Sequence, residues 1–240
     1  MKKRNDQNVI VKRAVLVFIL MFLVLLAALA FFTRSIVMRE QLKASYTAET
    51  TIANVEAQLN RYLAESELLK SIIESGYEIS DSDFAALSKL MYNEDGIIKA
   101  VELAPNGVVR SVYPQASNAD ALGLNMLRHP ERKVEASLAK ESGQYTIAGP
   151  FQLVQGGTGA LLFDPIYTTG ADGSQKYWGF SVLVLDWESF LDEIQINKLQ
   201  DASYEYLIWK EGHNGERIVI AQGDRPVGPN TMEAGCAVPN

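Results

Sequence analysis

The hydrophobic pattern begins with nineteen consecutive positions that carry no charged or polar side chain, residues 14–32. A helix over this run spans roughly 28 Å, close to the hydrocarbon thickness of a bilayer. Lipid offers the backbone no hydrogen-bond partner, so a helix is the structure expected there. We therefore predict a transmembrane helix over residues 14–32, preceded by a basic tail over residues 1–13.

A cleaved signal peptide is the competing interpretation of this run. Ala28-Leu29-Ala30 resembles the small-residue site at which such peptides are cut. However, the run is longer than the usual signal core of about 7–15 residues, and two phenylalanines follow directly. We favour the anchor, and both interpretations export the remainder of the chain.

Residues 33–75 contain no proline or glycine, and their apolar positions alternate at spacings of three and four. This pattern predicts that the membrane helix continues outward as a long amphipathic helix, which Gly76 ends. Its apolar stripe either packs on the rest of the domain or pairs with a second copy in a parallel homodimer. In the second case the dimer and signalling face contains Ile52, Val55, Leu59 and Tyr62.

Residues 76–183 alternate between helix and strand signals. A short helix capped by Asp81 or Ser82 precedes a hairpin that turns at Pro105-Asn106-Gly107, and another helix runs from Pro130 to about Glu141 before Gly143. The expected strands are Ile97–Leu103, Val108–Tyr113, Tyr145–Ala148, Phe151–Val154, Ala160–Tyr167 and Tyr177–Leu185.

Residues 184–240 repeat this alternation on a smaller scale. One helix is expected from Trp187 to about Leu199, followed by a pair of strands, Tyr204–Trp209 and Arg217–Ala221. Strands and helices joined by hairpins predict an α+β fold with antiparallel sheets. The chain stops without a closing strand, so we expect it to be a fragment whose second half is incomplete.

The charge distribution predicts how the chain is oriented across the membrane. Hydrophobic residues make up 48% and charged residues 21%, which is ordinary for a folded protein. The net charge is −7, and because the first 13 residues carry +4, residues 33–240 carry −11. Positive flanks stay inside the cell, so the amino end is expected in the cytoplasm and residues 33–240 in the periplasm or outside. The acidic balance argues against nucleic acid as a partner.

The residues suggest no catalytic machinery. No metalloprotease, nucleophile-elbow or phosphate-loop motif is present, and the single cysteine, Cys236, excludes an internal disulfide. His129 and His213 are interpreted as surface residues, and the neighbouring acids Asp192 and Glu193 as solvated charge. We expect no catalytic residue, no metal site and no cofactor. An exported hydrolase remains an alternative for which no residue can be nominated.

Four short motifs, in order behind the outward helix, together resemble the CHASE domain, a sensory module of transmembrane receptors. The resemblance covers roughly residues 40–225. The matching positions are Pro105, Gly107, Tyr113 and Pro114; Gly149, Pro150, Phe151 and Leu153; Pro165, Ile166 and Tyr167; and Trp178, Gly179 and Phe180.

This resemblance implies a long amino-terminal helix followed by two PAS-like subdomains, which map here to residues 76–183 and 184–240. It implies that the first, membrane-distal subdomain binds a small molecule. It also implies a second membrane helix and a cytoplasmic output, such as a histidine kinase or a diguanylate cyclase, beyond residue 240. The alternative function is a membrane-anchored exported adhesion or assembly protein without a signalling output.

A PAS-like pocket needs apolar walls, and the central strands supply them. By period-two alternation Phe151 and Leu153 share one face, as do Leu161 and Phe163. Two tyrosines, Tyr113 and Tyr167, lie at strand ends. These residues are the candidate ligand contacts, and the alternative is that they are plain core.

The resemblance also bears on ligand chemistry. In plant members an aspartate on the covering helix binds the purine of a cytokinin, and the corresponding position here is Arg132. Guanidinium only donates hydrogen bonds, so a cytokinin is doubtful, while a carboxylate- or phosphate-bearing ligand suits Arg132. On the predicted helix Arg132 lies opposite Val134 and Leu138, so the alternative is an arginine that faces solvent.

Overall fold

The computed structural model describes residues 2–92, 96–212, 215–228, 231 and 233–235, and side chains from residue 12 onward. His213 and Cys236 therefore lie outside the described residues. The chain divides into two compact units, of which the smaller contains residues 1–49 and the larger contains residues 50–231.

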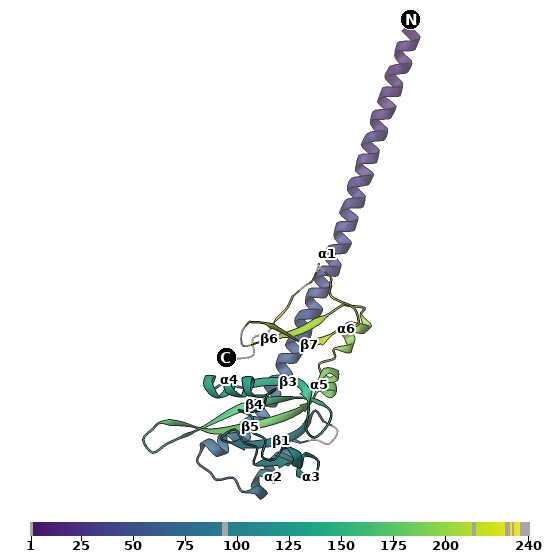
Figure 1. Ribbon diagram of the computed structural model, residues 1–240. Helices are drawn as coiled ribbons and strands as arrows, with labels where there is room; N and C mark the ends of the chain where they lie inside the picture. The colour runs from purple at the N-terminus through teal and green to yellow at the C-terminus, as the bar shows by residue number, and fades with distance from the viewer. Residues whose placement is uncertain (1, 93–95, 213–214, 229–230, 232, 236–240) are drawn as a thin grey trace. The chain divides into compact units, whose positions relative to one another are not determined.

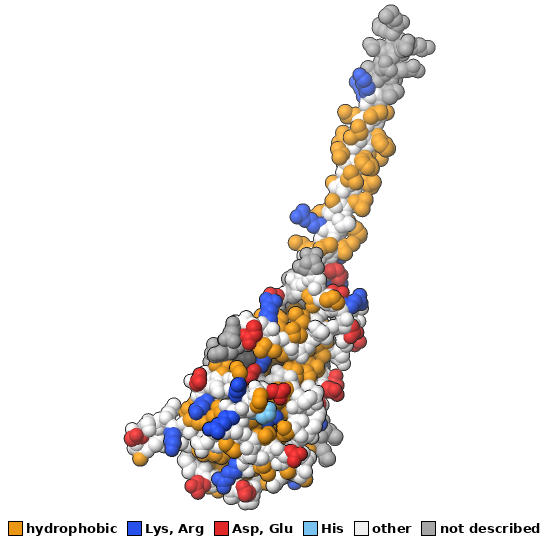
Figure 2. Space-filling model, in the orientation of Figure 1, with side chains coloured by type: hydrophobic (Ala, Val, Ile, Leu, Met, Phe, Trp, Pro, Cys, Tyr) orange, Lys and Arg blue, Asp and Glu red, His pale blue; other side chains and the backbone are white. Residues whose placement is uncertain are grey.

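A single helix, α1 (Lys2–Glu74), contains the predicted membrane segment and the predicted amphipathic segment. Its residues 14–32 are all exposed, and Figure 2 shows hydrophobic side chains along this segment. The helix is long and apolar enough to cross a membrane. Gly76, with a φ of +83°, follows its end. The predicted long helix and its end are confirmed.

The larger unit is built on a five-stranded antiparallel sheet in the order β2-β1-β5-β4-β3 (Figure 1). Its strands are β1 (Ile98–Pro105), β2 (Ser111–Tyr113), β3 (Thr146–Gln152), β4 (Thr158–Thr169) and β5 (Gln175–Asp186). Asn106 and Gly107, both with positive φ, turn the chain from β1 to β2 as the sequence predicts.

The region predicted as two strands on either side of Gly149-Pro150 is one strand. β3 pairs with β4 on both sides of this dipeptide, and the register shifts between Ala148 and Phe151. Gly149 has a φ of +109°, which glycine tolerates, so the strand continues through the irregularity. The expectation of a break was wrong because a proline at a sheet edge can interrupt the ladder without ending the strand.

Short helices cover the sheet. They are α2 (Asp81–Met91), α3 (Gln115–Asn118), the 3₁₀ helix η1 (Ala119–Ala121) and α4 (Lys133–Ser142). The cap of α2 is Ser80, whose Oγ accepts from the Asp83 backbone N–H, and not Asp81 or Ser82. Gly143 closes α4 in the left-handed conformation, as predicted.

The second half begins with two helices instead of the one predicted. These are α5 (Trp187–Glu193) and α6 (Asn197–Asp201), divided where Gln195 adopts a φ of +58°. The predicted strand pair is present as β6 (Leu207–Glu211) and β7 (Arg217–Gln222). The expected boundary between residues 183 and 184 lies inside β5, and the division into two subdomains stays a prediction.

The sheet separates two hydrophobic cores. One face packs against α1, α2, α5 and α6 through residues such as Leu69, Val101 and Leu183. The other face packs against α4 and the segment that leads into it, through Ala136, Phe163 and Met126. This arrangement of helices and antiparallel sheets confirms the predicted α+β class, and it gives the candidate site its place on the α4 face.

Candidate ligand-binding site

The α4 face of the sheet carries an acid in the middle of an apolar wall. Glu102 of β1 lies beside Val182 of β5, which in turn lies beside Phe163 of β4, and all three side chains are buried. Because alternate residues of a strand point to the same face, Leu161 and Val184 extend this wall. The wall is apolar everywhere around a single carboxyl group.

That carboxyl group is fully enclosed. Glu102 is 1% exposed, and its Oε2 has no hydrogen-bond partner. Burial raises the pKa of Glu102 from 4.5 to about 7, against the opposing attraction of Arg132. Glu102 therefore keeps its proton to a pH well above that at which a glutamic acid ordinarily loses it.

The opposite charge comes from the residue that precedes α4. Arg132 is 2% exposed; its guanidinium carbon lies 5.4 Å from the centre of the Phe151 ring, and one terminal nitrogen is 3.8 Å from Met126 Sδ. Its Nε has no partner. Burial lowers the pKa of Arg132, and Glu102 partly opposes this change.

The structure contradicts two expectations about α4 and the residue before it. The solvent-facing alternative was wrong, because Arg132 precedes the first residue of α4 and its side chain is buried against Met126 and Phe151. Val134 and Leu138, which were expected to face the core, are instead partly exposed, and Ala136 and Ala139 are buried. No ion pair within 4.0 Å joins Arg132 to Glu102.

The structure brings most of the predicted ligand contacts together. Arg132 lies in the same core as the four predicted wall residues, Phe151, Leu153, Leu161 and Phe163. Their presence in one core agrees with the predicted wall and with plain packing alike, so their role as ligand contacts stays a prediction.

The two predicted tyrosines lie elsewhere. Tyr167 contacts Tyr177 edge to face with ring centres 5.7 Å apart, and its hydroxyl donates to the Lys140 backbone carbonyl at the end of α4. Tyr167 therefore borders the α4 face. Tyr113 packs against the opposite core and contacts Tyr92, so the structure does not bring it together with Arg132.

Sequence reasoning missed Glu102. The signal was available, because Glu102 lies between Val101 and Leu103 in the predicted strand and on the same strand face as Ile98 and Ala100. Acids are almost never fully buried unless they are paired. An acid among the apolar residues of a predicted strand therefore itself indicates a candidate site.

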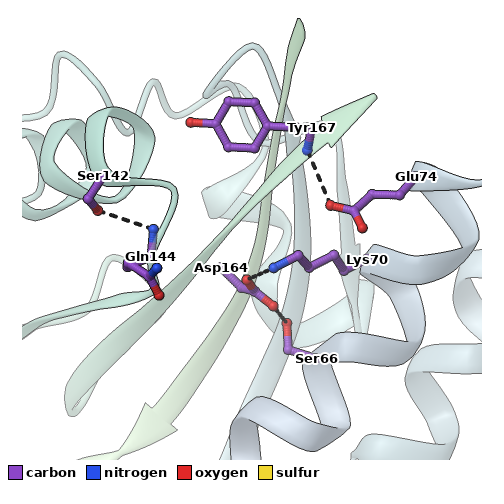
Figure 3. A network of polar contacts seen from close by, with 7 residues as sticks. All are labelled: Ser66, Lys70, Glu74, Ser142, Gln144, Asp164 and Tyr167. Carbon is purple, nitrogen blue, oxygen red and sulfur yellow. Dashed lines mark hydrogen bonds and ion pairs between the residues drawn. The ribbon is translucent and has the colours of Figure 1, made fainter. Parts of the chain in front are cut away.

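On the other face, β4 is tied to α1 by a buried polar network (Figure 3). Lys70 Nζ lies 3.0 Å from Asp164 Oδ1, and Ser66 Oγ donates to Asp164 Oδ2 at 3.0 Å. Burial raises the pKa of Asp164 even though Lys70 and Ser66 stabilise its charged form. Glu74 extends the network by accepting from the Tyr167 backbone N–H at 3.5 Å.

The stripe predicted as a dimer face lies largely against the larger unit's own core. Leu59 and Tyr62 are buried, and Val55 packs against the same cluster, while Ile52 is half-buried. Of the two alternatives for this stripe, packing within the domain is the one that applies to Val55, Leu59 and Tyr62. Pairing with a second copy stays a prediction.

Glu193 is not the solvated charge that the sequence analysis assumed. It accepts from the Tyr62 hydroxyl and from Arg61, each at 2.8 Å, at one side of a cleft of about 610 Å³. These contacts join α1 to α5. Among the described residues, no group of three or more His, Cys, Asp or Glu side chains is placed to hold a metal ion.

Comparison with known proteins gives the class and the family. The sequence model of the CHASE domain matches residues 52–220, more than half of the chain. The protein is thus a sensory module with an α+β fold built on antiparallel sheets. It belongs to the CHASE domain family, as the motif resemblance indicated. A search of curated proteins found no significant match.

Two solved structures are similar to parts of this chain. An extracellular ligand-binding receptor from Desulfohalobium retbaense DSM5692 is 17% identical, with a TM-score of 0.49 over 75% of this chain and 32% of that chain. The present chain thus spans about a third of that protein. The extracellular domain assigned to a histidine kinase, soHK1S-Z6, is 11% identical, with a TM-score of 0.46 over 78% of this chain and 89% of that chain.

Proposed function

We propose that this chain is the extracytoplasmic ligand-sensing module of a transmembrane receptor, and that its small-molecule ligand binds between the sheet and α4. The observation that carries the proposal is the pair Arg132 and Glu102. Both charges are buried on an otherwise apolar face, and each has an atom without a partner. Ligand sites have this character, with apolar walls and a few placed polar groups.

The route from ligand to membrane runs through β4. Phe163 faces the proposed ligand, and its neighbour Asp164 faces α1, where Lys70 and Ser66 hold it. A ligand that moves β4 therefore also acts on α1, which contains the apolar segment. The response requires that the ligand bind one arrangement more tightly than the other; a difference of about 1–3 kcal/mol is typical of such coupling.

The membrane topology is also part of the proposal. The apolar segment of α1 and its basic flank support an amino end in the cytoplasm, with residues 33–240 in the periplasm or outside. The output, a histidine kinase or a diguanylate cyclase, would lie beyond residue 240. Reporter enzymes fused after residue 240 test the orientation, because activity confined to the cytoplasm contradicts it.

We further infer that the receptor is a homodimer in which α1 of each copy takes part. The side of α1 opposite its buried stripe carries a shallow groove that includes Ala64, Leu68 and Ile72. Cysteine at Leu68 is expected to cross-link two copies in membranes, whereas cysteine at the buried Leu59 is not. Failure of every outward position to cross-link contradicts the dimer.

The ligand site is tested by a thermal-shift screen of the 240-residue chain in detergent, with small carboxylates, phosphates, purines and peptides. A ligand that binds only the folded state raises the melting temperature. Arg132→Met is expected to abolish the shift. Arg128→Met, which changes an exposed arginine in the preceding loop, is the matched control and is expected to preserve it. Equal shifts in both variants would place the ligand elsewhere.

A further inference from the structure

We infer that the ligand is a small zwitterion, a molecule with one carboxylate and one ammonium group, as in an α-amino acid. Arg132 binds the carboxylate and Glu102 binds the ammonium group. This inference rests on the proposed function, because it names the ligand class of the same site.

The argument begins with two charges that the fold leaves incompletely paired. Arg132 and Glu102 are 2% and 1% exposed, and no ion pair joins them. A buried charged group without full pairing is costly, so native proteins seldom keep one without a function. The Nε of Arg132 and the Oε2 of Glu102 are the atoms that a ligand can satisfy.

The chemistry of the two groups fixes the ligand's charges. A guanidinium group only donates hydrogen bonds, and an ionised carboxylate only accepts them. When Glu102 is ionised, an anion satisfies Arg132 but leaves Glu102 without a donor, and a cation does the reverse. A zwitterion satisfies both groups and leaves the buried site neutral overall.

Other charged side chains near α4 are exposed to solvent or already have partners. Glu135 accepts from Lys210 at 2.9 Å, and Lys140 lies 4.8 Å from the centre of the Tyr177 ring at the edge of the face. His129 is partly exposed, and both burial and the positive charge of Arg132 lower its pKa, so it is neutral near pH 7. Arg132 and Glu102 are therefore the charges that define the ligand.

The remaining wall selects the rest of the molecule. Phe151, Phe163 and Val182 offer only apolar surface, and Phe163 packs on Phe180 with ring centres 5.4 Å apart. An apolar or aromatic substituent on the zwitterion fits this surface. A second charged group on the ligand would be buried without a partner.

The test uses the 240-residue chain in detergent and matched probes. The proteinogenic amino acids are screened singly by thermal shift, and leucine is compared with 4-methylpentanoate, which lacks its amino group, and 3-methylbutylamine, which lacks its carboxylate. For each amino acid that binds, the corresponding acid and amine are compared in the same way. We expect at least one apolar amino acid to bind at least tenfold more tightly than either of its two analogues.

Variants connect this preference to the two residues. Glu102→Gln is expected to remove the advantage of the amino acid over its carboxylic acid analogue, while Glu102→Asp retains part of it. Arg132→Met is expected to weaken the binding of the amino acid and of its acid analogue alike. Should a variant fail to fold, the ligand comparison in the unchanged chain still decides the question.

Proton release gives a second readout. An ammonium group beside Glu102 favours its ionised form, so calorimetry at pH 6 in buffers of different ionisation enthalpy should show a proton released on amino-acid binding. No release, or an acid analogue that binds as tightly as its amino acid, overturns the zwitterion. Absence of binding by every amino acid also overturns it. The proposed function fails separately, if Arg132→Met leaves the binding of every ligand in the screen unchanged, whatever its class.

Discussion

Lys70 of α1 and Asp164 of β4 form a largely buried ion pair, with Nζ and Oδ1 separated by 3.0 Å. Asp164 follows Phe163 in the strand, and the two side chains point to opposite faces of the sheet. One face belongs to the proposed ligand site and the other to the helix that contains the apolar segment. Two adjacent residues thus place both ends of the proposed signalling route on one strand.

Removal of the lysine from this pair is expected to destabilise the domain. Lys70→Met leaves the Asp164 carboxylate, whose side chain is 3% exposed, with Ser66 as its remaining partner. An uncompensated buried charge costs about 3–5 kcal/mol. The free energy of unfolding, measured by chemical denaturation, should fall by about 3 kcal/mol.

The control for this change is Lys133→Met, which alters an exposed lysine and should have little effect. Adding Asp164→Asn to Lys70→Met should recover part of the lost stability, because the buried carboxylate is then neutral. Equal stability of the Lys70 and Lys133 variants would show that the ion pair contributes nothing.

Because Glu102 is buried, the stability of the folded chain is expected to depend on pH. Its pKa in the folded chain is about 7, above the ordinary 4.5, so the fold favours the protonated group. The stability contributed by this preference is fully present below pH 4.5 and is lost as the pH rises to about 7. Compared with Glu102→Gln, the native chain should lose about 3 kcal/mol of stability across this range.

The measurement is the difference between the two unfolding free energies at several pH values, because groups that titrate identically in both chains cancel. Arg132 stays charged throughout, and its attraction to the ionised carboxylate opposes the loss. A difference that does not change between pH 4.5 and 7 would mean that Glu102 is solvated.

Gly179 of β5 is expected to tolerate no side chain. A Cβ at this position would lie 2.3 Å from the Ala104 carbonyl oxygen and 2.8 Å from Pro105 Cα, which are backbone atoms of the neighbouring strand. Gly179→Ala must therefore separate β5 from β1 and should cost about 3 kcal/mol of stability or more. Gly228→Ala, where no atom lies within 4 Å of the new Cβ, is the control. Similar melting temperatures for the two variants would be incompatible with the close approach.

Lys210 of β6 connects the two-stranded sheet to the proposed ligand cover. Its Nζ donates to Glu135 Oε1 of α4 and to the Ile147 backbone carbonyl of β3, both at 2.9 Å. Lys210→Met should let α4 open more often, so amide hydrogen exchange within residues 133–142 is expected to accelerate several-fold. Lys198→Met alters a lysine that bonds only within its own segment, and exchange in α4 should then be unchanged. Acceleration by both variants would indicate general loosening instead.

The local elements were predictable because each depends on neighbouring residues. The long helix follows from a stretch without proline or glycine, and Gly76 and Gly143 end helices because glycine adopts positive φ readily. The hairpin at Asn106 and Gly107 has the same origin. Where sequence interpretation failed, as at β3, a tertiary pairing partner held together a strand whose local signal indicated a break.

The site was predicted in part. Period-two alternation placed Leu161 and Phe163 on one face correctly, but it did not decide which face would be covered by α4. Tyr113, at a strand end, was therefore grouped with them although it lies on the opposite side of the sheet. Helical periodicity gave solvent exposure as the alternative for the candidate contact Arg132, whereas α4 begins one residue later and Arg132 is buried.

The sequence by itself determined the apolar segment, the order of helices and strands, and the family, because these depend on composition and on spacing along the chain. Only the tertiary structure decided that Glu102 and Arg132, thirty positions apart, are buried on the same face of the sheet. It also decided that Lys70 holds the strand that lines that face. Burial and pairing are set by residues distant in sequence, and no local pattern encodes them.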